Sequence, residues 1–502
     1  MIQFILTSVC ALLIAGYFYI SWNYDHWKKR NIPGPKARFL LGNLPSVVTQ
    51  KRNITYDMDD LYREFKDRYG LIGYYNTRSP ALMVLQPDLA RDMLIKNFKH
   101  FADNEFADLA DKNVDPILSR NPFMLKGEEW KEKRAEITPA FTTSRIKTMY
   151  PIIEDVCANM KKYLEEEFEK ETMDGIDAKE LSAMYTTDVV SSCIFGVDAG
   201  SFTGGDATIR KMGKGLFDPT WQMMVYFFMM EIIPFLTKFY KMPMVPKHVE
   251  KFFVKIMKDA IALRRKTDVN RFDYLHYLLE LQEKKNLNEL DMVAHAVTFF
   301  LDGFETSSIA MAFTLYELGK CKNVQEKLRQ EIRETIAKHG KITHEVVSEM
   351  PYLDQVLNES LRLYPPATML GKICTEKITI KVKEGEYRYI EEGDDVTFPV
   401  YSFHRDPEFY ENPDEFIPER FDPENGGVKA FRDKGVFVPF GDGPRICLGQ
   451  RFAQAQIKAA LVSLLDNFEV EVNPKTKEPI IFDPKQFLTY AIGGLWLNFK
   501  RI

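Results

Sequence analysis

The segment 440–449 reads Phe440-Gly441-Asp442-Gly443-Pro444-Arg445-Ile446-Cys447-Leu448-Gly449. Three glycines and a proline surround its single cysteine. Glycine accepts left-handed backbone conformations and lets the main chain approach a ligand closely. Backbone N–H groups can then point at the sulfur, and a nearby cation, here Arg445, favours a thiolate over a thiol. The next segment, 450–465, has helical spacing, and its start would add positive dipole near the sulfur. The loop is therefore suited to hold a thiolate as a metal ligand.

The pattern F-G-x-G-x-R-x-C-x-G in this segment resembles the haem-binding loop of the cytochrome P450 monooxygenases. In that family a cysteine thiolate ligates the haem iron. The resemblance implies a metal ligand at Cys447 and haem b (iron protoporphyrin IX) as the cofactor. It also implies that Phe440, Gly441, Arg445 and Gly449 shape the cofactor site. A cysteine taken alone would more often be a buried structural residue in a glycine-rich turn.

The whole chain supports one large globular unit behind a short N-terminal region. Its 502 residues would allow three domains of average size, yet no linker, repeat or low-complexity segment divides them. The net charge of −5 does not favour a nucleic-acid partner. The six cysteines are far apart and show no zinc spacing, which argues against a disulfide framework. The resemblance implies a mainly α fold with small β-sheets.

The N-terminal segment has the composition of a membrane anchor. Residues 2–22 are mostly apolar, and about 20 residues suffice to span a bilayer. Lys28, Lys29 and Arg30 follow, and the positive-inside rule keeps them in the cytosol. A buried core helix is the alternative. We therefore expect a membrane anchor at 1–22, a basic and proline-rich linker at 23–45 with a stiff hinge at Pro33-Gly34-Pro35, and a haem-thiolate catalytic domain at 46–502.

Three further residues are assigned to the cofactor only through the resemblance. Trp130 and Arg134 are four residues apart and share a helix face, which alone would suggest an exposed cation–π pair. The family pattern W-x-x-x-R implies instead that both reach a haem propionate, and the segment His404-Arg405-Asp406-Pro407 implies that His404 donates to one. Lys372 lies where relatives often have arginine, which puts one propionate contact in doubt.

A polar turn interrupts the long apolar helix expected at 287–320. It reads Asp302-Gly303-Phe304-Glu305-Thr306-Ser307-Ser308. Glycine and hydroxyl side chains weaken a helix locally, so the turn suggests an opening that holds water. A solvated polar face is the alternative. The turn resembles the oxygen-activation motif (A/G)-G-x-(D/E)-T, which implies proton delivery by Glu305 and Thr306; Asp302 stands where the family usually has a small residue, beside the oxygen pocket.

Other segments carry expectations about structure. Glu359-Ser360-Leu361-Arg362 resembles the family's E-x-x-R motif, which implies a buried network with Arg420 rather than a surface ion pair. The segment 215–240 is either a core helix pair or a flexible lid that touches the membrane and admits apolar substrates. We also expect a helix at 58–69, strands at 71–75 and 81–85, and a hairpin formed by 487–492 and 495–499.

These residues together predict a haem-thiolate monooxygenase that inserts one oxygen atom into an apolar small molecule. No nucleotide-binding motif is present, so electrons would come from an NADPH-dependent cytochrome P450 reductase, with cytochrome b5 as a further possible donor. A basic docking face is expected at Lys131, Lys133, Arg432, Lys434 and Arg451. The alternatives are a haem-thiolate isomerase or dehydratase, and a haem sensor without turnover.

The resemblance extends from the anchor to the C-terminus and is greatest to insect microsomal members. It implies the endoplasmic reticulum membrane, with the catalytic domain on the cytosolic face and lipid as a partner. The sequence leaves detoxification of foreign compounds and metabolism of hormones or lipids equally open.

Overall fold

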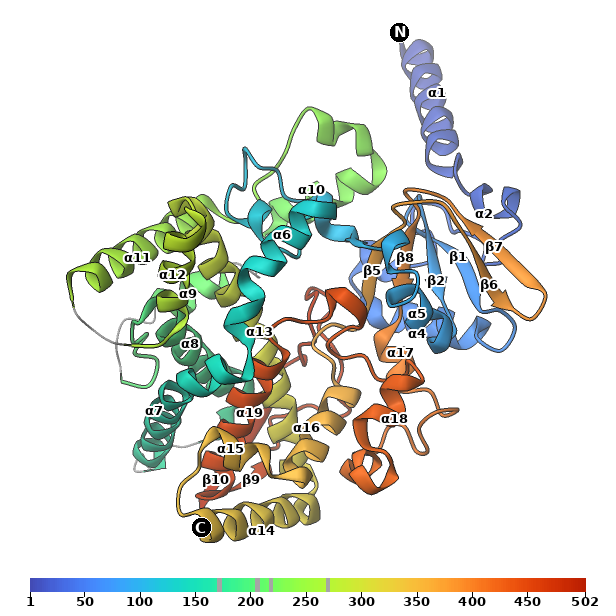
Figure 1. Ribbon diagram of the computed structural model, residues 1–502. Coiled ribbons are helices and arrows are strands. Elements are labelled where there is room, and N and C mark those ends of the chain that lie inside the picture. The colour runs from blue at the N-terminus through green and yellow to red at the C-terminus, as the bar shows by residue number, and fades with distance from the viewer. Residues whose placement is uncertain (169–173, 204–207, 216–219, 268–270) are drawn as a thin grey trace.

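Helices form most of the molecule. The computed structural model describes residues 1–168, 174–203, 208–215, 220–267 and 271–502 (Figure 1). The longer helices are α1 (Ile2–Ser21), α4 (Ile54–Phe65), α5 (Pro87–Leu94), α6 (Gly127–Ile137), α7 (Thr143–Phe168), α8 (Ala178–Phe195), α10 (Trp221–Ile232), α11 (Lys247–Lys266), α12 (Tyr274–Lys285), α13 (Glu289–Lys320), α14 (Lys322–His339), α16 (Pro351–Leu363) and α19 (Gln450–Leu465). The shorter ones are α2 (His26–Lys29), α3 (Pro45–Thr49), α9 (Thr208–Lys214), α15 (His344–Ser348), α17 (Val400–His404) and α18 (Gly427–Asp433).

Small sheets complete the fold. One has the strand order β1-β2-β8-β5-β3, a second β4-β10-β9, and a third pairs β6 with β7. The strands are β1 (Leu71–Asn76), β2 (Ser79–Val84), β3 (Asp103–Asn104), β4 (Ile176–Asp177), β5 (Leu370–Ile373), β6 (Ile378–Lys383), β7 (Glu386–Ile390), β8 (Asp395–Phe398), β9 (Phe468–Val472) and β10 (Trp496–Arg501). The mainly α class with small sheets is confirmed.

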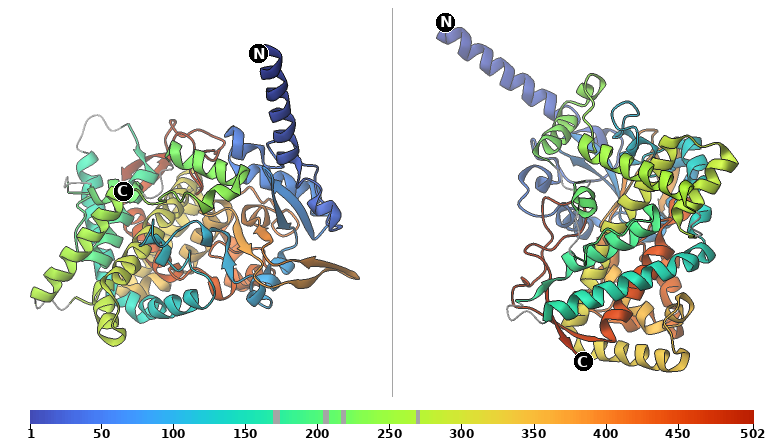
Figure 2. Two further views of the ribbon diagram at one scale, coloured as in Figure 1. Left: turned by 90° about the horizontal axis from the view of Figure 1, so that it is seen from above. Right: turned by 90° about the vertical axis from the view of Figure 1, so that its left-hand side faces the viewer.

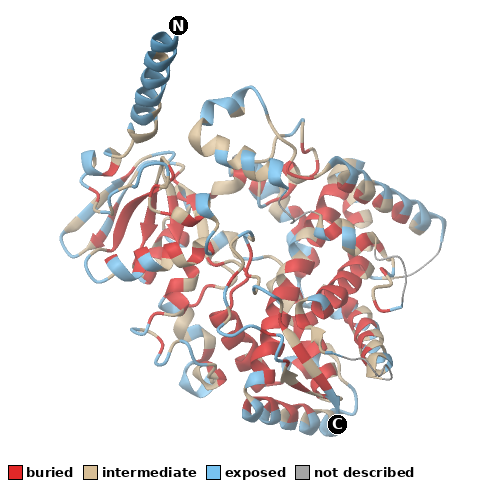
Figure 3. Ribbon diagram, turned by 180° about the vertical axis from the view of Figure 1, so that it is seen from behind, coloured by how far each residue is buried: buried red, intermediate tan, exposed pale blue. Residues whose placement is uncertain are grey.

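Two hydrophobic cores hold these elements together. The larger core gathers around α13, which runs through the helical part with α8, α16 and α19 packed against it, while α7 packs on α8 and α19 (Figure 1). The smaller core lies under the five-stranded sheet and includes α4 and α5. Figure 3 shows buried residues concentrated in these two regions. Because α13 is buried along most of its length, its polar turn lies in the interior rather than on a solvated face.

Most secondary-structure predictions hold, with two informative exceptions. The strands expected at 71–75 and 81–85 are β1 and β2, and the long helix expected at 287–320 is α13. Helix α4 begins earlier than expected because Asn53 caps it, accepting a hydrogen bond from the Thr55 backbone N–H at 3.0 Å. The expected hairpin of 487–492 with 495–499 is wrong: β10 pairs with β9 and β4, and left-handed backbone at Gly493 and Gly494 precedes it.

Helix α1 stands away from the rest of the molecule in every view (Figure 2). None of its residues is buried, which contradicts the alternative of a core helix. Its length and apolar composition suit a membrane span.

The segment after α1 packs on the globular part before it reaches the stiff hinge expected at Pro33-Gly34-Pro35. Trp27 is buried, and its indole N–H donates to the Tyr74 carbonyl at 3.0 Å. A side chain at Gly73 would collide with that indole ring, so glycine is required there. Arg30 holds Asp394 at 2.6 Å. The start of this segment is thus packed against the five-stranded sheet.

Helix α10 lies at the edge of the molecule and buries none of its residues. Trp221, Phe235 and Phe239 are exposed on and just after it, Phe239 by 82%. The Arg78 guanidinium donates to the Ile232 carbonyl at 2.9 Å, which fixes the end of α10 against the β1–β2 turn. The alternative of a core helix pair is therefore wrong for this segment; positions 216–219 of the expected lid lie outside the described residues.

Candidate active site

The cysteine loop is closed by its own backbone. The Cys447 N–H donates to the Phe440 carbonyl at 2.8 Å, which turns the chain back on itself. Gly441 and Gly443 both have left-handed φ angles of 71°. At Gly443 a side chain would also collide with the Leu94 carbonyl at the end of α5. Glycine is therefore needed at both positions to present the cysteine.

Cys447 has exposed surface although it lies deep in the fold, so it borders a space inside the molecule. Burial raises the pKa of its thiol to about 11, and the charge of Asp302 acts in the same direction. The backbone N–H groups of Gly449 and Gln450 lower it, as expected for the start of α19. The cation that lowers the pKa is Arg134, so the expected role of Arg445 in favouring the thiolate passes to Arg134.

Arg445 is instead part of a buried cationic cluster. Its guanidinium stacks on Trp130, 4.2 Å from the ring centroid. It donates to the Ala102 carbonyl, to the Pro122 carbonyl at 3.1 Å and to the Leu125 carbonyl at 2.8 Å. These bonds tie the irregular segment 102–125 to the cysteine loop.

Arg134 and Lys372 complete the cationic cluster. Arg134 donates to the Ile446 carbonyl at 2.7 Å. Lys372 is buried and donates to Asn104 Oδ1 at 2.6 Å. Burial lowers the pKa of Arg445 to about 10, and burial together with the charge of Arg445 lowers that of Lys372 to about 7. The cluster is therefore electrostatically suited to bind anionic groups.

His404 lies beside this region, but both its ring nitrogens are occupied. Nε2 accepts the Val438 backbone N–H at 2.9 Å, so the proton is on Nδ1, 3.2 Å from the Arg362 carbonyl. Burial lowers the pKa of His404 to about 3, which keeps the ring neutral. No ring N–H remains for a haem propionate, so the structure does not support that expected role.

The polar turn of α13 is unusually rich in side-chain hydrogen bonds. Thr306 Oγ1 donates to the Asp302 carbonyl at 2.8 Å, and Ser308 Oγ donates to the Glu305 carbonyl at 2.8 Å. Gln456 and Thr186 from neighbouring helices donate to the carbonyls of residues 303 and 304. Each carbonyl from 302 to 305 thus has a side-chain donor, which competes with the helical hydrogen bond.

The two acids of this turn have different surroundings. The Glu305 carboxylate is buried, 2.7 Å from Lys179 Nζ, and it accepts the Tyr490 hydroxyl. Asp302 has exposed surface deep in the fold and is hydrogen-bonded by Asn121. Burial raises the pKa of Asp302 to about 7. Asp302 therefore borders the same internal space as Cys447, whereas Glu305 is held by its partners.

Sequence reasoning missed the partners of both acids. Asn121 lies in an irregular segment, and Lys179 and Tyr490 lie more than a hundred residues from the turn, so no local pattern identifies them. Only the departure of Asp302 from the family motif indicated that this position is unusual.

The E-x-x-R network is buried as expected. Arg362 Nε and Nη2 hold the Glu359 carboxylate at 2.7 and 2.8 Å. The other donors of Arg362 reach the carbonyls of His404, Pro413 and Glu415. Arg420 adds a contact to Glu359 at 3.2 Å. The network braces the segment that precedes the cysteine loop.

Comparisons with known proteins agree with this geometry. The family model described as "Cytochrome P450" matches residues 32–497. The chain belongs to the cytochrome P450 family. It is 42% identical to probable cytochrome P450 28a5 of Drosophila melanogaster over 99% of this chain and all of that relative. It is 40% identical to probable cytochrome P450 28d1 and 32% identical to cytochrome P450 6a2 of the same fly, over 98% and 99% of those chains.

Family membership makes this P450 a monooxygenase with haem b as its cofactor. The expected resemblance to insect members is confirmed by the fly relatives. The residues present fit the cofactor. A thiol borders the internal space, and the three buried cations Arg134, Lys372 and Arg445 outnumber the neighbouring carboxylate of Asp103, which leaves positive charge for the cofactor's carboxylates. Redox partners and hydrophobic substrates are general in the family.

Proposed function

We propose that this P450 inserts one oxygen atom into an apolar small molecule, using electrons from a membrane-bound NADPH-dependent reductase. The observation that carries the proposal is that Cys447 and Asp302 of the polar turn both keep exposed surface although they lie deep in the fold. The thiol and the proton-delivering turn therefore face each other across one internal space. Haem bound there supplies the oxygen and electron chemistry.

The residues of this chain take distinct roles in the proposal. Cys447 ligates the iron, with Phe440, Gly441 and Gly449 shaping its loop. Trp130, Arg134 and Arg445 hold the cofactor's carboxylates, and Lys372 joins them. Thr306 and Asp302 deliver protons at the internal space, since both belong to the turn that borders it. Glu305 belongs to the same turn and supports proton delivery from a buried position, where Lys179 and Tyr490 hold its carboxylate.

The proposal places the catalytic domain, 46–502, on the cytosolic face of the endoplasmic reticulum. Helix α1 within 1–22 would span the membrane, and the segment 23–45 would lie between the two. The exposed aromatic side chains around α10 would touch the same lipid surface, because they are apolar and lie on one edge of the molecule. Cytochrome b5 is a further possible electron donor.

Product analysis with a reconstituted reductase tests the proposal. Substrate-induced difference spectra across steroids, fatty acids and plant toxins would first identify ligands. Those ligands should give products that carry one atom from ¹⁸O-labelled oxygen, with NADPH consumption that requires the reductase. Conversion of a ligand without reductase would point to an isomerase or dehydratase, and binding without any product to a sensor.

A further inference from the structure

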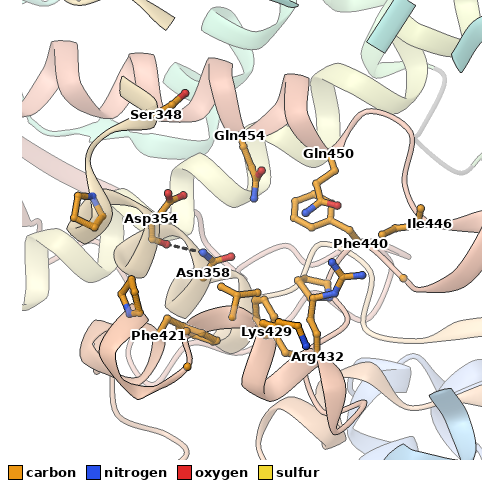
Figure 4. Close-up of a pocket in the computed structure, with 18 of the residues that line it drawn as sticks. Ser348, Asp354, Asn358, Phe421, Lys429, Arg432, Phe440, Ile446, Gln450 and Gln454 are labelled. Atoms are coloured by element: carbon orange, nitrogen blue, oxygen red, sulfur yellow. Dashed lines mark hydrogen bonds between the residues drawn. The ribbon is translucent and has the colours of Figure 1, made fainter. Parts of the chain in front are cut away.

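A second cavity lies on the other side of the cysteine loop. It has a volume of about 590 Å³ and lies between α16, α18, α19 and the loop (Figure 4). Phe440, Gly441 and Ile446 line it, whereas Cys447, Asp302 and Thr306 do not. The loop therefore separates this cavity from the internal space that Cys447 borders.

The charged groups around the cavity are neutralised by partners. Asp354 is held by Lys458 at 2.5 Å, and Arg432 by Asp442 at 3.1 Å. Lys429 pairs with Asp433. Glu349 also lines the cavity, 3.3 Å from His339. The acidic residues Glu349 and Asp354 are thus matched by the basic residues Lys429 and Arg432, so an occupant of this cavity needs no net charge.

Uncharged polar groups reach into the cavity from two helices. Gln454 of α19 points into it, and Gln450 lies one turn earlier on the same helix (Figure 4). On α16, Asn358 Nδ2 donates to the Asp354 carbonyl at 2.7 Å, which leaves the amide oxygen of Asn358 as an acceptor. Carboxamides both donate and accept hydrogen bonds, so they suit neutral polar groups on a ligand.

We propose that this cavity binds an uncharged, mainly apolar small molecule through the carboxamides of Asn358, Gln450 and Gln454, and that its occupant acts on the cysteine loop. Ligand pockets commonly enclose about 300–1,000 Å³ and combine apolar walls with a few polar groups. Phe421, Val428 and Phe437 provide apolar walls here.

The route from the cavity to the thiol is short. Phe440 lines the cavity, and its carbonyl accepts the Cys447 N–H at 2.8 Å. Ile446, the residue directly before Cys447, also lines it, and its carbonyl accepts a hydrogen bond from Arg134 at 2.7 Å. An occupant that moves either residue changes a group in direct contact with the cysteine. The site is independent of which substrate the enzyme oxidises.

Photolabelling of the full-length holoenzyme tests the site. The probe is 4-[3-(trifluoromethyl)diazirin-3-yl]benzyl alcohol, which is uncharged and apolar with one hydroxyl. Clotrimazole in excess would block the space in front of the haem iron. We expect saturable labelling of peptides from 351–358 and 421–454 that clotrimazole does not prevent.

Two cavity-filling variants, Val428→Trp and Gln454→Trp, should each reduce this labelling at least tenfold. The matched control is Glu424→Trp, an exposed position near the same rim that does not line the cavity. An unchanged Soret band of the reduced carbonyl complex would show that each variant is folded. The probe should also shift the iron–sulfur stretching band in resonance Raman spectra of the parent and Glu424→Trp only.

Three results would overturn the proposal. One is labelling of the same peptides in both cavity-filling variants at the parent level. Another is complete loss of labelling with clotrimazole, which would assign the probe to the substrate space. The third is a defect in reductase-supported turnover in both variants with labelling unchanged, which would make the cavity part of a docking surface for the partner.

Discussion

Two buried arginines, Arg362 of α16 and Arg445 of the cysteine loop, show how differently the same side chain is used. Arg362 faces the carboxylate of Glu359 with two hydrogen bonds, so its charge is neutralised inside the protein. Arg445 is bound mostly by neutral carbonyls, with Asp103 more distant at 3.4 Å, and burial lowers its pKa to about 10. Neutralised charges support the fold, whereas charges left without a close partner mark the site.

The same contrast separates the two acids of α13. Glu305 is paired with Lys179, and Asp302 keeps a carboxyl whose pKa is raised to about 7. The two lysines of α6 differ in exposure rather than in pairing. Lys133 lies in a half-buried network with Glu136 and Asp291, whereas Lys131 is 57% exposed and pairs with Glu128 at 2.5 Å on the surface. Because Lys133 is largely buried in this network, Lys131 is the lysine of α6 better placed to contact a redox partner.

The largest change is expected for a substitution of Cys447, because the charges without a close partner can serve a cofactor only if haem is bound beside this cysteine. Cys447→Ser should abolish the red-shifted Soret band of the reduced carbonyl complex, since only a thiolate ligand produces it. Cys374→Ser, at a buried cysteine far along the chain, serves as the control. Retention of the band in Cys447→Ser would assign the iron ligand to another residue.

Arg362→Met tests the neutralised member of the pair. Removing one partner of a buried ion pair leaves an uncompensated charge and costs about 3–5 kcal/mol. The free energy of unfolding, measured with urea, should fall by that amount, and the double variant Glu359→Gln/Arg362→Met should recover part of it. Equal instability of the single and double variants would contradict a charge-based role.

Arg445→Met tests the other arginine with the same substitution. We expect a smaller loss of stability but roughly tenfold faster transfer of haem to apomyoglobin, since a charge-assisted bond of about 1.5–3 kcal/mol to the cofactor is lost. Arg362→Met, assayed under conditions where it stays folded, is the matched control. Unchanged haem transfer in Arg445→Met would remove Arg445 from the cofactor site.

Thr306→Ala should lower the ratio of product to NADPH several-fold and release hydrogen peroxide instead. Asp302 can still donate a proton while it is protonated, that is, below pH about 7. In Thr306→Ala the ratio of product to NADPH should therefore fall further as the pH rises through about 7, because Asp302 then loses its proton. The variant Thr306→Ala/Asp302→Ala should be poorly coupled at every pH. If the ratio of product to NADPH in Thr306→Ala does not change with pH, Asp302 is excluded from proton delivery.

The smallest effect is expected for the two lysines of α6. Lys131→Glu should raise the reductase concentration for half-maximal turnover by about threefold or less at low salt, since exposed charges are screened within about 8–10 Å. At high salt the difference should vanish. Lys133→Glu should instead lower the unfolding temperature, because its network is broken. Identical reductase titrations for Lys131→Glu and the parent at low salt would exclude this docking residue.

The sequence alone was sufficient to locate features whose residues form one continuous motif. The cysteine loop, the polar turn of α13 and the Glu359–Arg362 pair each depend on residues within ten positions, so pattern alone located them. Where a residue's partner is distant in sequence, pattern failed. His404 is bound to Val438 and Arg362, and Lys133 to Asp291, and these contacts exist only after folding. The hairpin prediction failed for the same reason, since β9 and β4 take both edges of β10.

The docking of Trp27 and Arg30 on the five-stranded sheet has a mechanical consequence. A membrane helix on a loose tether would let the globular part rotate freely above the bilayer. Here the residues that follow α1 are wedged against Gly73 and Asp394, so the helix works as a lever fixed at its base. The bilayer would then impose a tilt on the whole enzyme and turn one edge toward the lipid. Lipid composition determines the thickness of the bilayer. Through the tilt of the helix, that thickness would set how deeply this edge of the enzyme enters the membrane.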